Sequence, residues 1–182
     1  MTYYGGKELA ESFRTVRKNT IQIAKDIPET KYDFKPAPDV RSVGETLVHI
    51  AFGTSWQSRV HRDRIDDMAK VNFQELMAAT NAEMARPRSK EQIIGLLESE
   101  GESFAAFLES LTDSILAERV SMMPGQQPAA RTRFEMLLGP KEHEMHHRGQ
   151  LMLVERILGV VPHLTRQFQE RMARSQPAQA QR

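Results

Sequence analysis

The sequence predicts an all-α protein, a four-helix bundle with short extra helices. Four long segments carry apolar residues at helical spacing, and no segment shows a convincing strand pattern. The connection between the second and third long helices is long, which permits a crossover topology instead of a simple up-and-down order. The 182 residues suit a single domain, expected over residues 1–174, with a disordered polar tail over residues 175–182.

The first helix is expected over about residues 7–26. Its apolar residues recur with helical period and include Leu9, Phe13, Val16 and Ile23. Pro28 should end this helix, because proline cannot continue the backbone hydrogen bonding. Pro36 and Pro38 then mark a loop.

The second helix is expected to begin with a capping box formed by Ser42 and Glu45 and to run unbroken to about Arg62. In such a box the hydroxyl accepts from the backbone N–H three residues later, and the carboxylate accepts from the first N–H. The stretch over residues 63–88 is less regular. Apolar residues around Phe73 predict a short helix within this long connection.

A second capping box, Ser89 with Gln92, predicts the start of the third helix. A loop over residues 124–128 separates it from the last long helix, expected over about residues 130–158, and a short final helix is expected over residues 165–174. Pro140 interrupts the fourth pattern, so either that helix kinks there or Pro140 begins a fresh helix.

Charge and composition exclude several classes of protein. The 25 basic and 24 acidic residues are interspersed and give a net charge of +1, so we expect no nucleic-acid partner. No apolar run approaches the roughly 18 residues of a membrane span, and residues 1–6 do not resemble a secretory signal. The chain has no cysteine, which excludes disulfides and thiolate ligands and fits a cytoplasmic protein.

The most informative segment is His143-Glu144-Met145-His146-His147. Residues four apart share one face of a helix, so His143 and His147 should point the same way, toward the bundle interior. A lone histidine on an apolar stripe is usually a hydrogen-bonded core residue. Two buried neutral rings, however, lack partners for their lone pairs, and a metal ion resolves that problem.

A third ligand must come from elsewhere, and His49 in the middle of the second helix is the best candidate. Three imidazoles leave coordination positions open, which is typical of catalytic metal sites. Three imidazoles also suit several divalent ions, so the residues alone do not choose the metal.

The same segment matches the H-E-x-x-H pattern of zinc proteases, in which Glu144 would be the general base. We favour the alternative that Glu144 is a solvated acidic residue matching by chance, because the chain offers no strand edge to hold a peptide. Trp56 and Arg148 are candidate pocket residues. Each has a plainer alternative, since Trp56 is as well explained by the core and Arg148 by pairing with a carboxylate across a dimer.

The remaining histidines are not expected to bind the metal. His146 is turned by about 100° from His147 on the helix and should lie at the pocket rim or an interface. His61 lies in a charged run and should face solvent. His163 follows Pro162 beyond the fourth helix and should be structural.

At these residues the chain resembles the DinB/YfiT-like superfamily of metalloenzymes. The resemblance covers about residues 9–162. It is carried by His49 within Gly44-Glu45-Thr46-Leu47-Val48-His49, by His143-x-x-x-His147-Arg148-Gly149-Gln150, and by Leu158-Gly159-Val160-Val161-Pro162. The early loop Asp33-Phe34-Lys35-Pro36 is also similar to that family.

The resemblance implies a four-helix bundle with crossover topology and a homodimer. It also implies a divalent ion (nickel, zinc, iron or manganese) held by His49, His143 and His147. Characterised relatives are transferases or isomerases that use a low-molecular-weight thiol such as bacillithiol, mycothiol or glutathione, so a small-molecule substrate is expected.

Three hypotheses on function follow. The first is a metal-dependent transferase that uses such a thiol. The second is a hydrolase that uses metal-bound hydroxide, with Glu144 as base. The third is a non-catalytic, stress-related metal-binding bundle.

Overall fold

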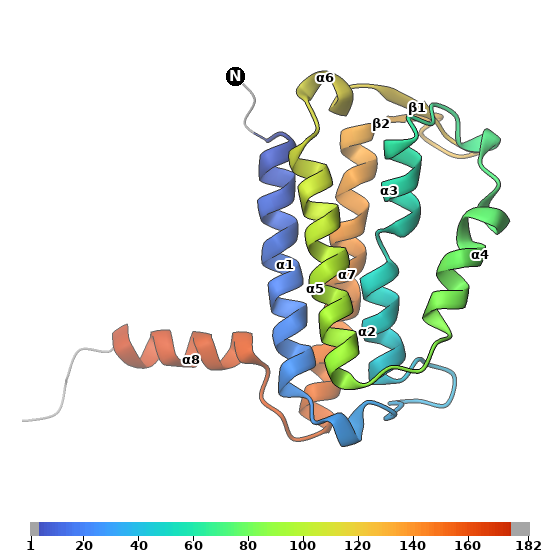
Figure 1. Cartoon of the computed structure of the whole chain (residues 1–182). Coiled ribbons are helices and arrows are strands. Elements are labelled where there is room, and N and C mark those ends of the chain that lie inside the picture. The colour runs from blue at the N-terminus through green and yellow to red at the C-terminus, as the bar shows by residue number, and fades with distance from the viewer. Residues whose placement is uncertain (1–3, 176–182) are drawn as a thin grey trace, which may run out of the picture.

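Four long helices pack side by side and form the body of the protein (Figure 1). The computed structural model describes residues 4–175. The bundle helices are α1 (Gly6–Asp26), α2 (Val43–Phe52), α5 (Lys90–Glu109) and α7 (Arg133–Ile157). Helix α1 lies against α5 and α7, and α2 lies against the same two helices from the opposite side. The all-α prediction is therefore confirmed.

The connection from α2 to α5 makes the bundle a crossover bundle. Helix α3 (Ser55–Arg62) continues in the direction of α2, and α4 (Phe73–Met84) returns along the outside of the bundle, so that α5 starts near the same end as α2 (Figure 1). Two single 3₁₀ turns, η1 (Glu29–Lys31) and η2 (Met68–Lys70), lie in the connections. Helices α2 and α5 consequently run in the same direction, and α1 and α7 run in the other.

Three bundle helices begin with a complete capping box. Ser42 accepts from Glu45 at the start of α2, and Ser89 accepts from Gln92 at the start of α5, as predicted. Thr132 and Glu135 form a third box at the start of α7. Each box satisfies backbone N–H groups that the first helical turn leaves without partners, so the sequence fixes where these three helices begin.

The core consists of apolar residues from all four bundle helices. One cluster joins α1, α2, α5 and α7, and its fully buried members include Ile23, Leu47, Ile50, Leu97 and Leu151. A second cluster joins α1, α5 and α7 toward the other end, with Phe13 and Phe104 in edge-to-face contact at 5.0 Å between ring centroids. Large apolar side chains of this kind contribute about 1.5–3 kcal/mol each when fully buried.

The second helix is shorter than expected. Instead of running unbroken to Arg62, it ends at Phe52, and α3 starts at Ser55 after a turn at Gly53 and Thr54. The N–H of Gly53 bonds to the carbonyl of Ile50, three residues back, which tightens the last turn of α2. Glycine has a low helix propensity, and this glycine lies against His143 of α7.

The expectation that the chain has no strand is wrong in one place. Strands β1 (Arg119–Ser121) and β2 (Ala130–Thr132) pair antiparallel, with Val120 opposite Arg131. Helix α7 accordingly starts at Arg133 instead of Ala130. Strands of three residues are too short to display an alternating pattern. The two strands and the short helix α6 (Asp113–Leu116) close one end of the bundle (Figure 1).

Pro140 lies within α7 without ending it. The helix runs continuously from Arg133 to Ile157, so the alternative of a fresh helix at Pro140 is wrong. Gly159 follows α7 with a φ of +77°, the left-handed conformation of a helix C-terminal cap. The ligand-bearing part of α7 is therefore one uninterrupted helix.

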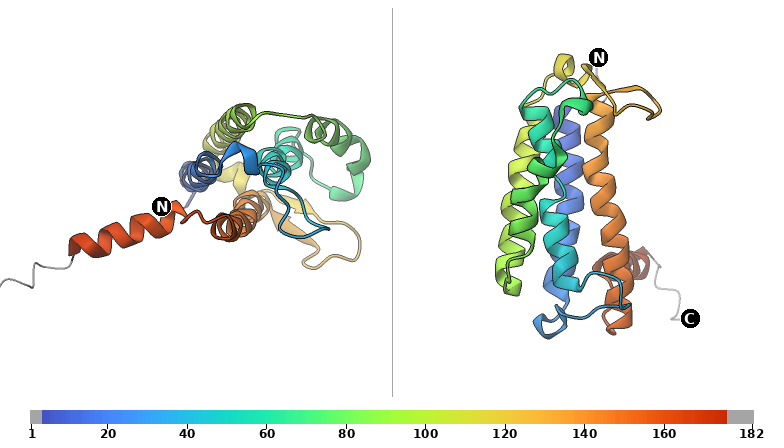
Figure 2. Two further views of the ribbon diagram at one scale, coloured as in Figure 1. Left: turned by 90° about the horizontal axis from the view of Figure 1, so that it is seen from below. Right: turned by 90° about the vertical axis from the view of Figure 1, so that its right-hand side faces the viewer.

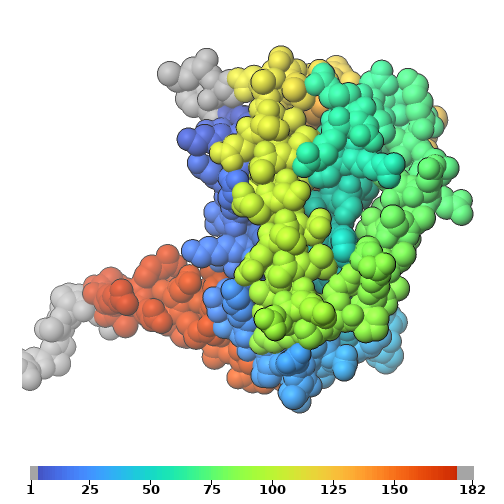
Figure 3. Space-filling view, viewed as in Figure 1, coloured from blue at the N-terminus to red at the C-terminus, as the bar shows by residue number. Residues whose placement is uncertain are grey.

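Helix α8 (His163–Ser175) leaves the body of the protein as a projecting arm (Figures 2 and 3). The short final helix is thus confirmed, with slightly wider bounds than predicted. Ser175 belongs to α8, and the rest of the expected disordered tail, residues 176–182, lies outside the described residues. None of the helices within residues 4–175 is long and apolar enough to span a membrane.

Candidate metal centre

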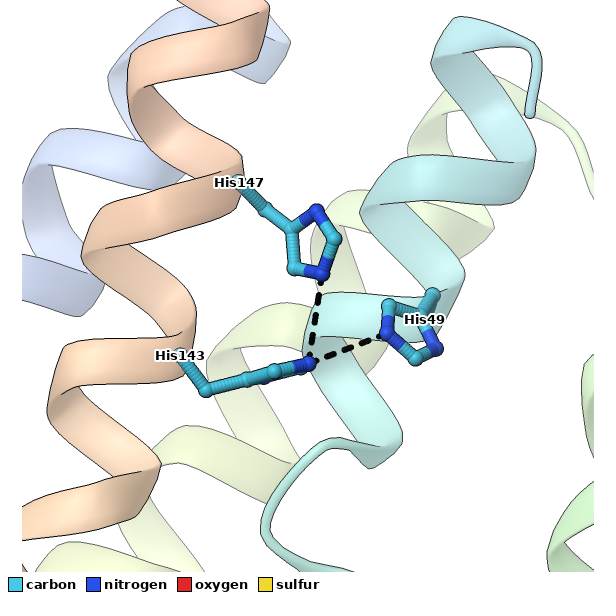
Figure 4. Close-up of side chains that lie close together, drawn as sticks. All are labelled: His49, His143 and His147. Atoms are coloured by element: carbon cyan, nitrogen blue, oxygen red, sulfur yellow. Dashed lines mark hydrogen bonds between the residues drawn. The ribbon is translucent and has the colours of Figure 1, made fainter. Parts of the chain in front are cut away.

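Three histidine side chains from two helices point toward one another (Figure 4). Nε2 of His143 lies 3.0 Å from Nε2 of His49 and 3.2 Å from Nε2 of His147. One ligand atom from each residue lies within 4.8 Å of the other two, and no other group of three such residues does so among residues 4–175. The structure therefore brings together the three residues expected to bind a metal.

Helix geometry accounts for this convergence. His143 and His147 are one turn apart on α7, so their rings lie on one face of the helix in edge-to-face contact, with centroids 4.6 Å apart. His49 reaches the same point from α2, with its ring centroid 4.9 Å from that of His143. Two packed helices thus supply all three nitrogens, and neither flexible loops nor chain termini are needed.

The nitrogen spacing fits a transition-metal ion. Imidazole nitrogens bind zinc at about 2.0–2.1 Å, which in a tetrahedral site separates neighbouring nitrogens by about 3.3–3.4 Å. The two distances in the cluster, 3.0 and 3.2 Å, are close to that spacing. Three imidazole nitrogens suit zinc, iron and nickel, whereas magnesium and calcium prefer oxygen ligands.

The environment keeps the three imidazoles in the neutral form that binds metals. Burial lowers the pKa of His49 to about 4, with further contributions from the positive charge of Arg41 and from the other two histidines. Burial also lowers the pKa of His143 and the pKa of His147. Because only the neutral ring has a free nitrogen lone pair, the cluster is ready to bind a cation at neutral pH.

Gln150 holds His147 in one orientation. Its Oε1 lies 2.8 Å from Nδ1 of His147, and its Nε2 lies 3.2 Å from Nε2 of His146. An amide oxygen can only accept, so Nδ1 of His147 carries the proton, and Nε2 is left with its lone pair facing the cluster. This is the arrangement of outer-shell partners around metal-binding histidines.

A pocket of about 930 Å³ opens beside the cluster, and His49 and His147 form part of its wall. The rest of the wall comes from the loop after η1, from α2, from the end of α4 and from the last turns of α7. The loop contributes Lys35 and Arg41, and α7 contributes the apolar Leu153 and Ile157. The cluster is thus accessible to a small molecule. The pocket wall carries charges of both signs, since Asp39 and Glu45 also line it and Glu45 pairs with Lys35.

Glu144 does not face this pocket. It is 1% exposed, so it is not the solvated residue that the sequence favoured. Both of its carboxylate oxygens lie 3.0 Å from Nε of Arg17, on the interior side of α7. The H-E-x-x-H match therefore does not place a free carboxylate beside the cluster.

Trp56 and Arg148 do not line the pocket either. The Trp56 ring packs edge-on against Phe73, with 6.1 Å between ring centroids, in a small apolar cluster between α3 and α4. Arg148 is partly buried and lies near His163, the pKa of which its charge helps to lower, after the larger effect of burial.

The other three histidines have separate surroundings. His146 is exposed beside Gln150. His163 is buried at the start of α8 and hydrogen-bonds Asn19 of α1, which fits a structural role. His61 is 1% exposed instead of facing solvent, because α3 turns it toward Arg133 of α7, 3.2 Å away.

Sequence reasoning missed three contributors. Arg41 lies in a loop without a recognisable pattern, and Gln150 has no signal in the sequence beyond its place in the motif. Arg17, by contrast, had a signal in the sequence. It follows Leu9 and Phe13 at four-residue spacing on the buried stripe of α1, where a charged residue needs a buried partner.

Solved structures with the same fold come from several bacteria. A DinB-like protein from Bacillus subtilis is 23% identical, with a TM-score of 0.62 over 84% of this chain and 92% of that chain. An uncharacterised protein from Clostridium difficile 630 is 15% identical, with a TM-score of 0.62 over 86% of this chain and 99% of that chain. A protein from Streptococcus pneumoniae is 16% identical, with a TM-score of 0.63 over 86% and 93% of the two chains.

At these identities the structures share the fold with this chain. No curated protein matches the sequence. The family model of the DinB superfamily matches residues 12–151, which include all four bundle helices in whole or in part and all three clustered histidines. The chain is a member of the DinB superfamily.

Proposed function

We propose that this protein is a divalent-metal-dependent transferase that uses a low-molecular-weight thiol. The observation that carries the proposal is the position of His49 and His147 in the wall of the 930 Å³ pocket. A structural metal site is closed, whereas a catalytic one keeps coordination positions that a substrate can reach. An ion held by His49, His143 and His147 would supply the Lewis acidity that favours the thiolate form of a thiol.

The chain's own residues account for the remaining requirements of such a reaction. Arg41 is exposed in the pocket wall and close enough to lower the pKa of His49, so it is placed to bind a carboxylate of the thiol molecule. Leu153 and Ile157 offer an apolar surface for the electrophile. The sulfur forms the new bond to carbon with its electron pair, the leaving group departs with the pair of the broken bond, and the thiol proton goes to solvent.

Hydrolysis with Glu144 as general base has no comparable support. A general base must lie within hydrogen-bond reach of the proton that it removes, directly or through one water. The carboxylate of Glu144 is bound to Arg17 and does not line the pocket. A non-catalytic metal-binding bundle is the alternative that the experiments below distinguish.

Metal analysis tests the first half of the proposal. We expect purified wild type to contain a divalent transition metal, and His49→Ala and His147→Ala to lose it. His146→Ala is the matched control, because it removes an exposed histidine of the same helix outside the cluster. Equal metal content in all four proteins would show that the cluster does not bind the ion.

A thiol screen tests the second half. The metal-loaded protein is incubated with bacillithiol, mycothiol or glutathione and a model electrophile, and formation of the thioether is followed. We expect one thiol to be turned over by wild type and His146→Ala but not by His147→Ala. Loss of Arg41 should raise KM for the thiol more than it lowers kcat. If none of the thiols reacts although the metal is bound, the transferase proposal fails and a binding role remains.

The homodimer is also part of the proposal. Helix α8 projects from the bundle and exposes Phe168 and Met172, four residues apart on one face. The start of α8 is tied to α1 through His163 and Arg166. A short helix with little further tertiary packing is marginally stable in water, which favours a partner for this face. Sedimentation analysis of wild type beside Phe168→Ser checks the state: a monomeric wild type would contradict the proposal.

A further inference from the structure

One arginine in the centre of the bundle contacts all of the other three bundle helices. Arg17 of α1 is 3% exposed. Its Nε donates to both carboxylate oxygens of Glu144 on α7 at 3.0 Å. Its Nη1 donates to the carbonyl of Leu97 on α5 at 2.8 Å, and its Nη2 donates to the carbonyl of Ile50 on α2 at 3.3 Å.

Two of these contacts lie directly beside metal-ligand candidates. Glu144 follows His143 in the chain, and Ile50 follows His49. Successive residues of a helix point about 100° apart, so the histidines face the pocket side while their neighbours face the interior. A single guanidinium therefore ties the backbone of α2 to the side chain of α7 immediately behind the three imidazoles.

Helix α5 is shaped to receive this side chain. A Cβ atom at Gly101 would lie 2.7 Å from Cγ and 3.1 Å from Nη1 of Arg17. Any residue larger than glycine would therefore push the arginine stem, because Cγ is near the base of the side chain and has little freedom to move. Gly95 of the same helix has open space around it, with no atom within 4 Å of an added Cβ.

Stability alone does not account for such a pair. Removing two charges from water is costly, and a well-packed apolar pair of similar size often gives an equally stable or more stable protein. An arginine adds directional hydrogen bonding. Its N–H donors lie in one plane, so they form hydrogen bonds only with partners in a narrow range of positions. Positions of metal ligands, in turn, must be held to within about 0.5 Å.

We propose that Arg17 and Glu144 are positioning residues that set the distance between α2 and α7, and with it the spacing of His49 from His143 and His147. This inference rests on the proposed metal-binding function. It assigns Glu144 of the H-E-x-x-H match an interior role in place of general base. The two residues touch neither the metal ligands' nitrogens nor the pocket.

Gly101→Ala tests the inference without changing any charge, and Gly95→Ala is the matched control in the same helix. Cobalt(II) is the probe, because its visible absorption spectrum reports the geometry of its ligands, and its affinity is measured by competition with a chelator. We expect Gly101→Ala to bind cobalt(II) about 10- to 100-fold more weakly, with an altered spectrum. Gly95→Ala should match wild type in both measurements.

A double variant, Arg17→Met with Glu144→Met, separates positioning from folding. Because it replaces the buried charges by apolar groups together, we expect the metal-free protein to keep its thermal midpoint while its cobalt(II) affinity falls as in Gly101→Ala. Wild-type affinity and spectrum in both the double variant and Gly101→Ala, with binding still abolished in His143→Ala, would overturn the inference and leave the metal site standing. Failure of wild type to bind cobalt(II) would overturn both.

Discussion

Nδ1 of His147 donates a hydrogen bond to Oε1 of Gln150, three residues along α7, at 2.8 Å. The bond decides which nitrogen of His147 is free, since the other ring nitrogen must then carry the lone pair that faces His143. Gln150, the last residue of the motif, thereby keeps the metal-binding nitrogen of His147 unprotonated.

Gln150→Leu should weaken metal binding about 10- to 100-fold, because it removes the acceptor that fixes the tautomer and orientation of His147. Gln150→Glu keeps an oxygen acceptor and should retain affinity close to that of wild type. Titration with a chelator as competitor measures both. Equal losses in the two variants would show that the amide contributes through packing and not as an acceptor.

Gly53→Ala should also weaken metal binding, for a steric reason. A Cβ at this position would lie 2.9 Å from Nδ1 and 3.0 Å from Cε1 of His143, so the ring would have to move away from His49. We expect a loss of about tenfold or more. Gly149→Ala on α7 is the control, since no atom lies within 4 Å of its added Cβ. Unchanged affinity in Gly53→Ala would mean that the cluster tolerates displacement of His143.

The sequence was sufficient for the parts of the protein that depend on local rules. Capping boxes place the starts of α2 and α5, and the four-residue spacing of His143 and His147 places both rings on one face of α7. Placing His49 opposite them needed only its position in the middle of another bundle helix. These features are set within one or two helical turns, where spacing decides orientation.

Features that depend on contacts between distant segments could not be predicted from local spacing in the sequence. The break at Gly53 shortens α2, and α3 packs His61 inward against Arg133 of α7 although charged residues surround His61 in the sequence. The roles of Glu144 and Arg17 depend on a contact between residues 127 positions apart. Helical periodicity shows which face of α1 is buried but not which charged group lies opposite it.

The buried His61 should make the protein sensitive to acid. Burial, assisted by the charge of Arg133, lowers the pKa of His61 from 6.5 to about 4. A group with a lowered pKa in the folded state contributes stability that is present above pH 6.5 and is lost as the pH falls toward 4. Relative to His61→Gln, wild type should therefore lose up to about 3 kcal/mol of unfolding free energy over this interval. Urea unfolding at several pH values measures the difference, and a constant difference would contradict a neutral, buried His61.

Glu155 should produce the opposite dependence. It is fully buried on α7, and neither of its carboxylate oxygens has a hydrogen-bond partner among residues 4–175. Burial raises its pKa from 4.5 to about 7, and the negative charge of Asp26 adds to this, while Arg166 and Arg156 oppose it. The folded protein therefore holds the proton more tightly than the unfolded chain does, and stability falls as the pH rises from 4.5 to about 7.

Glu155→Gln isolates this effect, because glutamine has nearly the same size and stays uncharged at every pH. We expect wild type and variant to differ little near pH 4.5, and the variant to become more stable by up to about 3 kcal/mol at pH 8, since each pKa unit corresponds to about 1.4 kcal/mol. Metal affinity should not change, because Glu155 lies two turns of α7 beyond His147 and outside the cluster. A variant that is less stable than wild type at pH 8 would show that the ionised carboxylate has a favourable partner in the folded protein.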